Sequence, residues 1–366
     1  MRALHIDENS VYRKLIGVGG VGTGIFFELE GNETLGRNES RPGRLLGVRD
    51  YCKLHIVIHY VAKLLGAQAS GSPFHVLPLG RVGDDTPGRQ VVKEMNEAGI
   101  DTHLVRTMQE HPTLFSVCFQ YPDGAGGNIT SSNSAASALS KGDIDGIADL
   151  LESGVIALAV PEITLEVRRY FLQVATKVGA FRVASFVPAE IGPAKQAGMF
   201  EVLDLVSLNE AEAGELIGSS FSRGEHEAFI AKCQDFLLRF CPSLRMVVSL
   251  GKAGAYGVTK DLWNYCPAPE VVVVSTAGAG DALLGGIIAA LGAGIPFLQT
   301  ESSKRKSPRP IGTALELGVM LASYKCLSPH TIHPSARIET LIDFARDRGR
   351  PFSPELLNFV TSRPSA

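Results

Sequence analysis

A run of small residues in the last third of the chain has the types and spacing of a phosphate-binding turn. The run is TAGAGD at 276–281, preceded by four valines at 271–274 and followed by the apolar segment ALLGGIIAAL. This order predicts a strand, a turn and a helix, whose first N–H groups and dipole favour an anion. Gly278 and Gly280 let a phosphate approach the main chain. Asp281, in the first helical turn, can accept a proton from a hydroxyl, and a simple helix cap fits it as well.

A second run, NEAE at 209–212, also follows an apolar run and opens a helical segment. Its spacing places Asn209 and Glu212 near the helix start on one face. That arrangement suits a capping box, in which Asn209 accepts from the first turn and Glu212 reaches back. It also suits a carboxylate that holds Mg²⁺ through water beside nucleotide phosphates, because Mg²⁺ keeps most of its waters. The residues alone leave both interpretations open.

A third glycine cluster lies near the N-terminus, where Gly17, Gly19 and Gly22 match the GxGxxG fingerprint of dinucleotide-binding proteins. The segment at 25–31 is short for the helix that would hold a pyrophosphate, and the acid at about the right distance is Glu39 in a polar loop. The other interpretation is a strand whose small residues let the backbone approach a ligand or a neighbour. A nicotinamide-dependent oxidoreductase therefore stays an alternative.

The elements that must position these runs alternate as expected for βαβ units around a parallel sheet. We expect strands at 14–18, 74–79, 154–160, 181–186, 203–208 and 246–250. We expect helices at 86–98, 165–177, 211–216, 225–240 and 280–291. One doubly wound sheet accounts for this order, so we predict a single domain over residues 1–366. Two regions break the alternation and predict a small β lid, inserted at about 24–52 and 113–133.

Composition and charge exclude several classes of protein. The 366 residues include 35 Lys and Arg against 38 Asp and Glu, a formal net charge of −3, so we expect no nucleic-acid or membrane partner. Hydrophobic residues make up 45%, which indicates a large core and not a disordered chain. The six cysteines form no CxxC pair, which favours reduced thiols in a cytoplasmic protein. The longest apolar stretch falls short of the roughly 20 residues of a membrane span.

Taken in order, four blocks resemble the ribokinase-like (PfkB) family of carbohydrate kinases. The blocks are GRVGDDTPG at 80–88 with AGIDT at 98–102, NEAE at 209–212, SLGKAGA at 249–255 and TAGAGD at 276–281. The resemblance runs from about residue 14 to about residue 329. It implies a three-layer α/β/α fold with a mostly parallel, doubly wound sheet and a small β lid. It also implies transfer of the γ-phosphoryl group of ATP to a hydroxyl of a small sugar, nucleoside or related polyol.

The resemblance assigns roles to single residues of this sequence. Asp281 matches the catalytic base, and the amides of Gly278, Ala279 and Gly280 match the anion hole. Glu212 matches the acid associated with Mg²⁺. The residues placed at the nucleotide are Asn209, Glu212, Ser249, Gly251, Gly254 and Thr276. These roles agree with the chemistry expected from the residues themselves, since phosphoryl transfer needs mainly positioning and charge neutralisation.

The acceptor side departs from the family pattern. Most relatives carry an Asp on the first strand that grips sugar hydroxyls; that place falls near Gly24, and the usual Gly-Gly and Asn are replaced within 51–57. Five polar residues of the expected lid are candidates to replace these contacts, and the arginines among them suit an anionic acceptor: Asn32, Glu33, Arg37, Arg41 and Arg44. Ser275 stands where relatives have an Asp that often helps to bind a monovalent cation, which leaves potassium dependence open. His330 and Thr331 replace a frequent Gly-Ala.

The main hypothesis is a cytoplasmic carbohydrate kinase that uses ATP and Mg²⁺ on a small-molecule substrate. A hypothesis from a different class is a sugar- or nucleotide-binding protein on the same fold that has lost catalysis, suggested by the altered acceptor side. The nicotinamide-dependent oxidoreductase is the third. The resemblance also implies a homodimer in which the lids pair, through the hairpin at 113–133.

Overall fold

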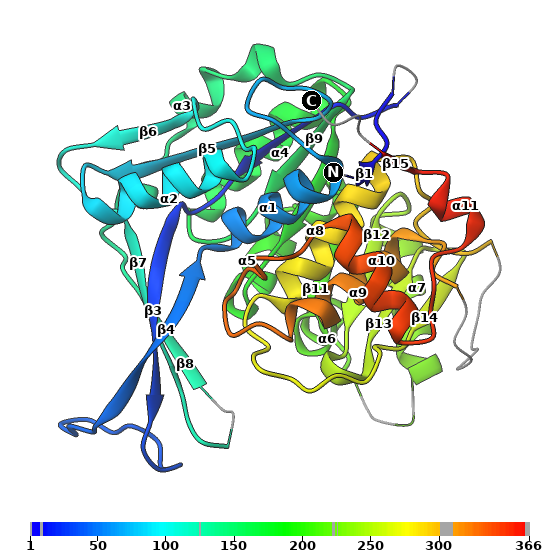
Figure 1. The fold of residues 1–366 in the computed structure, drawn as a ribbon. Coiled ribbons are helices and arrows are strands. Elements are labelled where there is room, and N and C mark those ends of the chain that lie inside the picture. Colours follow the sequence, from blue (N-terminus) through cyan, green and yellow to red (C-terminus); the bar gives the residue numbers. More distant parts are fainter. Residues whose placement is uncertain are drawn as a thin grey trace.

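The computed structural model describes residues 2–7, 10–123, 126–221, 224, 226–300 and 310–362. Its centre is a nine-stranded sheet in the order β14-β13-β12-β11-β10-β9-β2-β5-β6 (Figure 1). The strands from β12 to β6 are parallel, and β13 and β14 are antiparallel at one edge. The strands are β2 (Lys14–Val18), β5 (His75–Gly83), β6 (Val105–Met108), β9 (Val155–Ala159), β10 (Phe181–Ser185), β11 (Leu205–Asn209), β12 (Arg245–Ser249), β13 (Ala255–Val258) and β14 (Trp263–Cys266).

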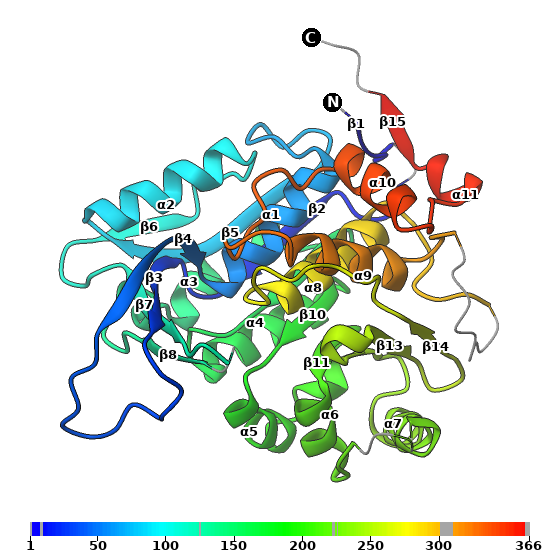
Figure 2. The same ribbon diagram turned by 60° about the horizontal axis from the view of Figure 1, so that its bottom comes forward.

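Helices cover both faces of this sheet (Figure 2), and each face has its own hydrophobic core. The first face carries α1 (Lys53–Leu65), α2 (Thr86–Glu97), α8 (Ala279–Gly292), α9 (Ala314–Lys325) and α10 (Ile338–Asp347). The second carries α3 (Lys141–Asp145), α4 (Leu165–Lys177), α5 (Ile191–Gln196), α6 (Glu210–Ile217) and α7 (His226–Phe240). This is the three-layer, doubly wound architecture that the resemblance implied.

A second, four-stranded sheet projects from the main body as a lid (Figure 1). Its order is β4-β3-β7-β8. The strands are β3 (Gly22–Leu29), β4 (Gly43–Tyr51), β7 (Leu114–Gln120) and β8 (Gly126–Thr130). The small lid expected on the fold is thus present, whereas the boundary of a single domain over the whole chain stays a prediction. The short strands β1 (Arg2–Leu4) and β15 (Val360–Ser362) pair near the two ends of the chain, and α11 (Pro354–Leu357) precedes β15.

Six of the seven expected strands and all the expected helices are present, with ends shifted by a few residues. The expected strand at 271–274 was wrong, because these residues join no sheet, and Val272 is 85% exposed. The β preference of valine needs a partner strand. Here the N–H groups of Val274 and Ser275 instead donate to the carbonyl of Cys326, at 2.8 and 3.3 Å. The chain therefore enters the turn along the end of α9.

The dinucleotide fingerprint at Gly17, Gly19 and Gly22 was also wrong. Gly22 begins strand β3 and no helix follows the glycines. A Cβ on Gly22 would lie 2.1 Å from the carbonyl oxygen of Leu114 in the neighbouring strand β7. The glycines therefore serve close packing against neighbouring elements, which was the alternative interpretation, and the fold gives no support to a nicotinamide-dependent oxidoreductase.

Two further expectations concern the cysteines and membranes. All six cysteines are free thiols, and five of them are buried. In the parts of the chain covered by the structure, no helix has both the length and the apolar character needed to cross a bilayer. The cytoplasmic location stays a prediction.

Candidate active site

The topology predicts where a ligand binds. From β2 the chain proceeds to β5 and β6 on one side, while β9 to β12 lie on the other, so the strand order reverses between β2 and β9. In open α/β sheets ligands bind at such a reversal, beyond the carboxyl ends of the strands. Three side chains leave strand ends on that edge: Glu162 after β9, Asn209 at the end of β11 and Ser249 at the end of β12.

The turn at 276–281 forms the N-terminus of α8. Gly278 is the N-cap with φ +79°, and a Cβ there would lie 2.5 Å from the carbonyl oxygen of Thr331, so both conformation and space require glycine. The first intrahelical bond runs from the N–H of Ala282 to the carbonyl of Gly278, 2.9 Å. The N–H of Ala279 already donates to Thr276, 3.1 Å. The donors most open to an anion are therefore those of the first helical residues around Gly280.

This turn is open to solvent. Thr276 and Gly280 are exposed, and no atom lies within 4 Å of the place that a Cβ on Gly280 would occupy. A phosphate group can therefore reach the N–H groups without moving a side chain. The carboxylate of Asp281, one residue further, is 12% exposed and lies at the edge of this opening.

Lys53, the first residue of α1, lies beside Asp281. Its Nζ is 3.6 Å from Oδ1 of Asp281, and this carboxylate is the main reason why the pKa of Lys53 is raised. Helix packing causes the approach: a Cβ on Gly285 of α8 would lie 2.8 Å from the carbonyl oxygen of Val57 in α1. That contact is one helical turn beyond the Lys53–Asp281 pair in both helices. Glycine at 285 thus lets α1 come close enough for its first side chain to reach Asp281.

Glu162 extends the cluster from the end of β9. Its backbone has φ +77°, in the left-handed region that costs a non-glycine residue of order 1 kcal/mol. Burial raises its pKa to about 7, although Lys53, the Cys52 thiol and the N–H of Lys53 act in the opposite direction. Its Oε2 is buried and has no hydrogen-bond partner among the described residues. Strain and an unfavourable charge at one residue are typical of functional sites.

Asn209 and Glu212 form the expected capping box at the start of α6. Oδ1 of Asn209 accepts from the N–H of Glu212, and Oε2 of Glu212 accepts from the N–H of Asn209, both at 2.9 Å. Burial raises the pKa of Glu212, and both Lys53 and Asp281 are close enough to act on it. Glu212 therefore caps its helix and also faces the cluster around Asp281.

Asp50 supplies a carboxylate that the sequence analysis missed. It lies on β4, is 6% exposed, and accepts a hydrogen bond from Sγ of Cys118 at 3.3 Å. Burial raises its pKa, and Asp281 contributes to the same shift. A Cβ on Gly24 would lie 2.5 Å from Oδ2 of Asp50. A carboxylate therefore lies beside Gly24, and it comes from the opposite strand.

The five predicted acceptor residues lie elsewhere in the lid. Arg41 pairs with Glu39 and also donates to the carbonyl of Glu33, and Arg44 pairs with Glu28 at 2.6 Å. Asn32 accepts from the N–H of Asp123, 3.0 Å. In the described parts of the chain, no hydrogen bond or ion pair joins any of the five, Asn32, Glu33, Arg37, Arg41 and Arg44, to Asp281. Their role as acceptor contacts stays a prediction without support from these contacts.

The remaining predicted nucleotide residues lie beside α6. Ser249 is paired with Asn209 in the parallel register of β11 and β12. The following turn contains Gly251 at φ +55° and Gly254 at φ +109°. A Cβ on Gly254 would lie 2.1 Å from the carbonyl oxygen of Cys266. The SLGKAGA block thus forms a tight hairpin next to the Asn209 end of the sheet.

His330 and Thr331, which depart from the family pattern, join the lid to the turn. Nδ1 of His330 accepts from the N–H of Arg49, 3.0 Å, and the N–H of Thr331 donates to the carbonyl of Arg49, 3.1 Å. Oγ1 of Thr331 accepts from the N–H of Tyr51, 3.1 Å, and its carbonyl packs on Gly278. This segment therefore fixes β4, and with it Asp50, relative to the turn at 276–281.

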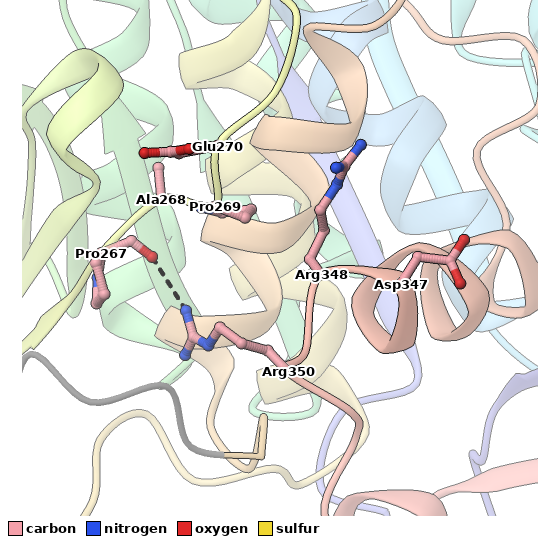
Figure 3. A pocket seen from close by; sticks show the side chains of 7 residues that line it. All are labelled: Pro267, Ala268, Pro269, Glu270, Asp347, Arg348 and Arg350. Atoms are coloured by element: carbon pink, nitrogen blue, oxygen red, sulfur yellow. Dashed lines mark hydrogen bonds between the residues drawn. The ribbon is translucent and has the colours of Figure 1, made fainter.

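A hollow of about 380 Å³ lies away from these residues (Figure 3). Its lining comes from 267–270 and from the end of α10, and Arg350 donates to the carbonyl of Pro267 at 3.0 Å. None of the predicted site residues lines it. We therefore place the site at Asp281, where residues from α1, β4, β9, α6 and α8 meet.

Comparison with known proteins gives the family. The model of the pfkB family carbohydrate kinase matches residues 58–337. A fructokinase of Klebsiella pneumoniae is 35% identical over 94 residues, which are 25% of this chain and 28% of that protein. Because the family model matches most of the chain, the protein belongs to the pfkB family of carbohydrate kinases. The match begins after Asp50 and Lys53, so it leaves out the altered acceptor side.

Solved structures share the fold at low identity. A ribokinase from Cryptococcus neoformans var. grubii serotype A, in complex with ADP, has a TM-score of 0.69 at 18% identity, covering 91% of this chain and 99% of that one. A ribokinase from Arabidopsis thaliana, complexed with ribose and ATP, has a TM-score of 0.63 at 19% identity, covering 95% and 98%. These likenesses confirm the ribokinase-like fold. The roles of single residues rest on the geometry above.

Proposed function

We propose that the protein transfers the γ-phosphoryl group of ATP to a hydroxyl of a small sugar, nucleoside or related polyol. The observation that carries the proposal is the open turn at 276–280 with the carboxylate of Asp281 directly beside it. N–H groups at the start of α8 receive the phosphates, and Asp281 takes the proton of the acceptor hydroxyl. One of the two ribokinase structures is a complex with ADP, and the other is a complex with ribose and ATP. These complexes support a nucleotide and a sugar as the ligands.

Glu212 suits a magnesium ion held through water. The capping box uses Oε2 of this side chain, which leaves Oε1 to accept from a water molecule of a hydrated ion. The described residues contain no group of three or more His, Cys, Asp or Glu side chains able to bind a metal, so coordination of the ion by protein ligands alone is not supported. A bound Mg²⁺ would neutralise charge on the nucleotide phosphates.

The charges around Asp281 favour an acceptor without negative charge. The carboxyl groups of Asp50, Glu162 and Glu212 all interact electrostatically with this cluster. Among the described residues, the ammonium of Lys53 is the positive charge that opposes them there. An anionic acceptor would meet like charges in a partly buried site, which disfavours its binding. Two of the three lid arginines that would suit such an acceptor, Arg41 and Arg44, already pair with carboxylates of the lid. We therefore assign Asp50 to the hydroxyl groups of a neutral polyol.

The test is replacement of Asp281 by Asn in an assay of ADP release with ATP, Mg²⁺ and a panel of neutral sugars, nucleosides and polyols. Loss of a general base lowers turnover about 10²- to 10⁴-fold. Glu166→Gln is the matched control, because Glu166 is also an acid in the first turn of a helix but pairs with Lys141 at the surface. Unchanged turnover of D281N with every acceptor would contradict the proposal.

One observation favours the second candidate, a binding protein that has lost catalysis. The Lys53 ammonium already pairs with Asp281, so the base is engaged before an acceptor arrives. In the kinase proposal the acceptor hydroxyl binds the other carboxylate oxygen, Oδ2, or displaces Lys53 from Oδ1. Calorimetric binding of a sugar or ADP, together with no ADP release for any acceptor, would favour the binding protein.

A homodimer through the lid is the corresponding proposal for assembly. β4 and β8 are the two edge strands of the lid, and they expose Leu45 and Ile129 at 59% and 66%. Exposed edge strands with apolar side chains readily pair with another chain. Light scattering of the wild type and of the double variant L45K/I129K tests this; a wild type that stays monomeric at high concentration would contradict it.

A further inference from the structure

A buried lysine lies beneath the phosphate-binding turn. Lys325, the last residue of α9, is 0% exposed, and its Nζ donates a 2.9 Å hydrogen bond to the carbonyl oxygen of Ser275. Ser275 directly precedes the turn at 276–281. Among the described residues, no carboxylate contributes to the pKa shift of Lys325. The ammonium is therefore buried without a negative partner.

The end of α9 also supports the turn through its backbone. The carbonyl of Cys326 accepts from the N–H groups of Val274 and Ser275, and the carbonyl of Thr331 lies against Gly278. Thr276 and Gly280 face solvent, whereas Lys325 is fully enclosed. The ammonium thus lies on the inner side of the turn, opposite the side that an incoming phosphate would reach.

A buried charge without a partner destabilises a protein, and an apolar side chain of similar size is usually the more stable choice. Burial lowers the pKa of Lys325 to about 8, which reflects this cost. The cost is offset when an anion binds nearby, because charges interact strongly across a poorly solvated interior. The phosphates at the start of α8 are the nearest place where the proposed function puts such an anion.

We infer that Lys325 is a positioning residue for the nucleotide phosphates, which holds the carbonyl of Ser275 and adds a fixed positive charge behind the turn. This inference rests on the proposed function of the turn.

The first experiment measures the affinity for Mg-ADP by calorimetry in K325M, which replaces the side chain by an unbranched apolar one that is one atom shorter and removes its charge. We expect at least a tenfold weaker affinity, with a melting temperature without nucleotide equal to or above that of the wild type. K195M is the matched control, because Nζ of Lys195 also donates to a backbone carbonyl, that of Leu216. Unchanged affinity, or a loss of affinity that merely accompanies a large fall in melting temperature, would overturn the inference.

The second experiment needs no variant. The affinity of the wild type for Mg-ADP should fall as the pH rises from 7.5 to 9, since Lys325 loses its proton near pH 8. The titratable neighbours of Lys325 keep their charge in this window, and Glu162 near the turn, with a pKa of about 7, is already mostly ionised at its start. Burial lowers the pKa of His330 and His333 and raises the pKa of Cys326 and of Tyr60 on α1. An affinity that is flat over this range would refute the inference, and ADP binding stays measurable even if no acceptor supports turnover.

Discussion

Replacement of Glu162 by Gln should stabilise the protein in a manner that depends on pH. Gln has the same shape and keeps an oxygen that can accept from the N–H of Lys53 and from the Cys52 thiol, both of which act on the Glu162 carboxylate. The substitution removes the carboxyl group, whose ionisation is disfavoured by burial. E162Q therefore separates the cost of the charge from the cost of the left-handed backbone at φ +77°, which the variant retains.

The size of the effect follows from the pKa of Glu162. A rise from the ordinary value of 4.5 to about 7 corresponds to about 3 kcal/mol in favour of the protonated carboxyl. Between these two values the folded state binds more protons than the unfolded state, so the stability of the wild type falls as the pH rises. The cost is complete above pH 7 and absent below pH 4.5. E162Q should thus unfold with about 3 kcal/mol more free energy at pH 8.5 and show little gain at pH 4.5.

Urea unfolding at the two pH values, followed by circular dichroism, measures this difference. Asp50 and Glu212 also have raised pKa values, but they titrate in both proteins and largely cancel in the comparison. In K53M the gain at pH 8.5 should be larger, because Lys53 lowers the pKa of Glu162. An equal gain at both pH values, or none at pH 8.5, would refute the argument that ionised Glu162 is a strained element of the site.

Two further predictions concern ligand contacts. G280A should fold like the wild type, since no atom lies within 4 Å of the new Cβ, yet it should raise the KM for ATP at least tenfold by blocking the phosphates. G142A in α3, where the new Cβ also has loose surroundings, is the control. Unchanged kinetics of G280A would place the phosphates elsewhere. D50N should raise the KM for a neutral acceptor at least tenfold and leave the KM for ATP within twofold. A change in the KM for ATP alone would contradict the assignment of Asp50 to the acceptor.

Features that depend on neighbours in the sequence were predicted well. The helix at 165–177 is observed with the same ends, because Thr164 caps it and its apolar residues recur at helical spacing. The capping box of Asn209 and Glu212 and the glycine turn before α8 are likewise local. These signals were sufficient for the order of strands and helices, and hence for the doubly wound sheet.

Features that depend on a partner distant in the sequence were predicted poorly. The valines at 271–274 have the composition of a strand, but the Cys326 carbonyl takes the N–H groups of the segment's last residue and of Ser275. Lys53 is an ordinary surface lysine by its sequence context. Lys53 reaches Asp281 because Gly285 packs closely on Val57, and the sequence does not reveal this contact between two distant helices. Glu162 gave no signal except its place just after a strand.

The acceptor side shows why a position that looks empty in a sequence need not be empty in space. Gly24 and Asp50 are directly opposite each other in the antiparallel pair β3–β4, next to an irregularity between Gly24 and Phe26. Because a Cβ on Gly24 would approach Oδ2 of Asp50 to 2.5 Å, the glycine is what admits the carboxylate from the other strand. Restoring Asp at 24 alone should then disrupt the site, whereas G24D combined with D50G exchanges the two side chains and returns a carboxylate to it.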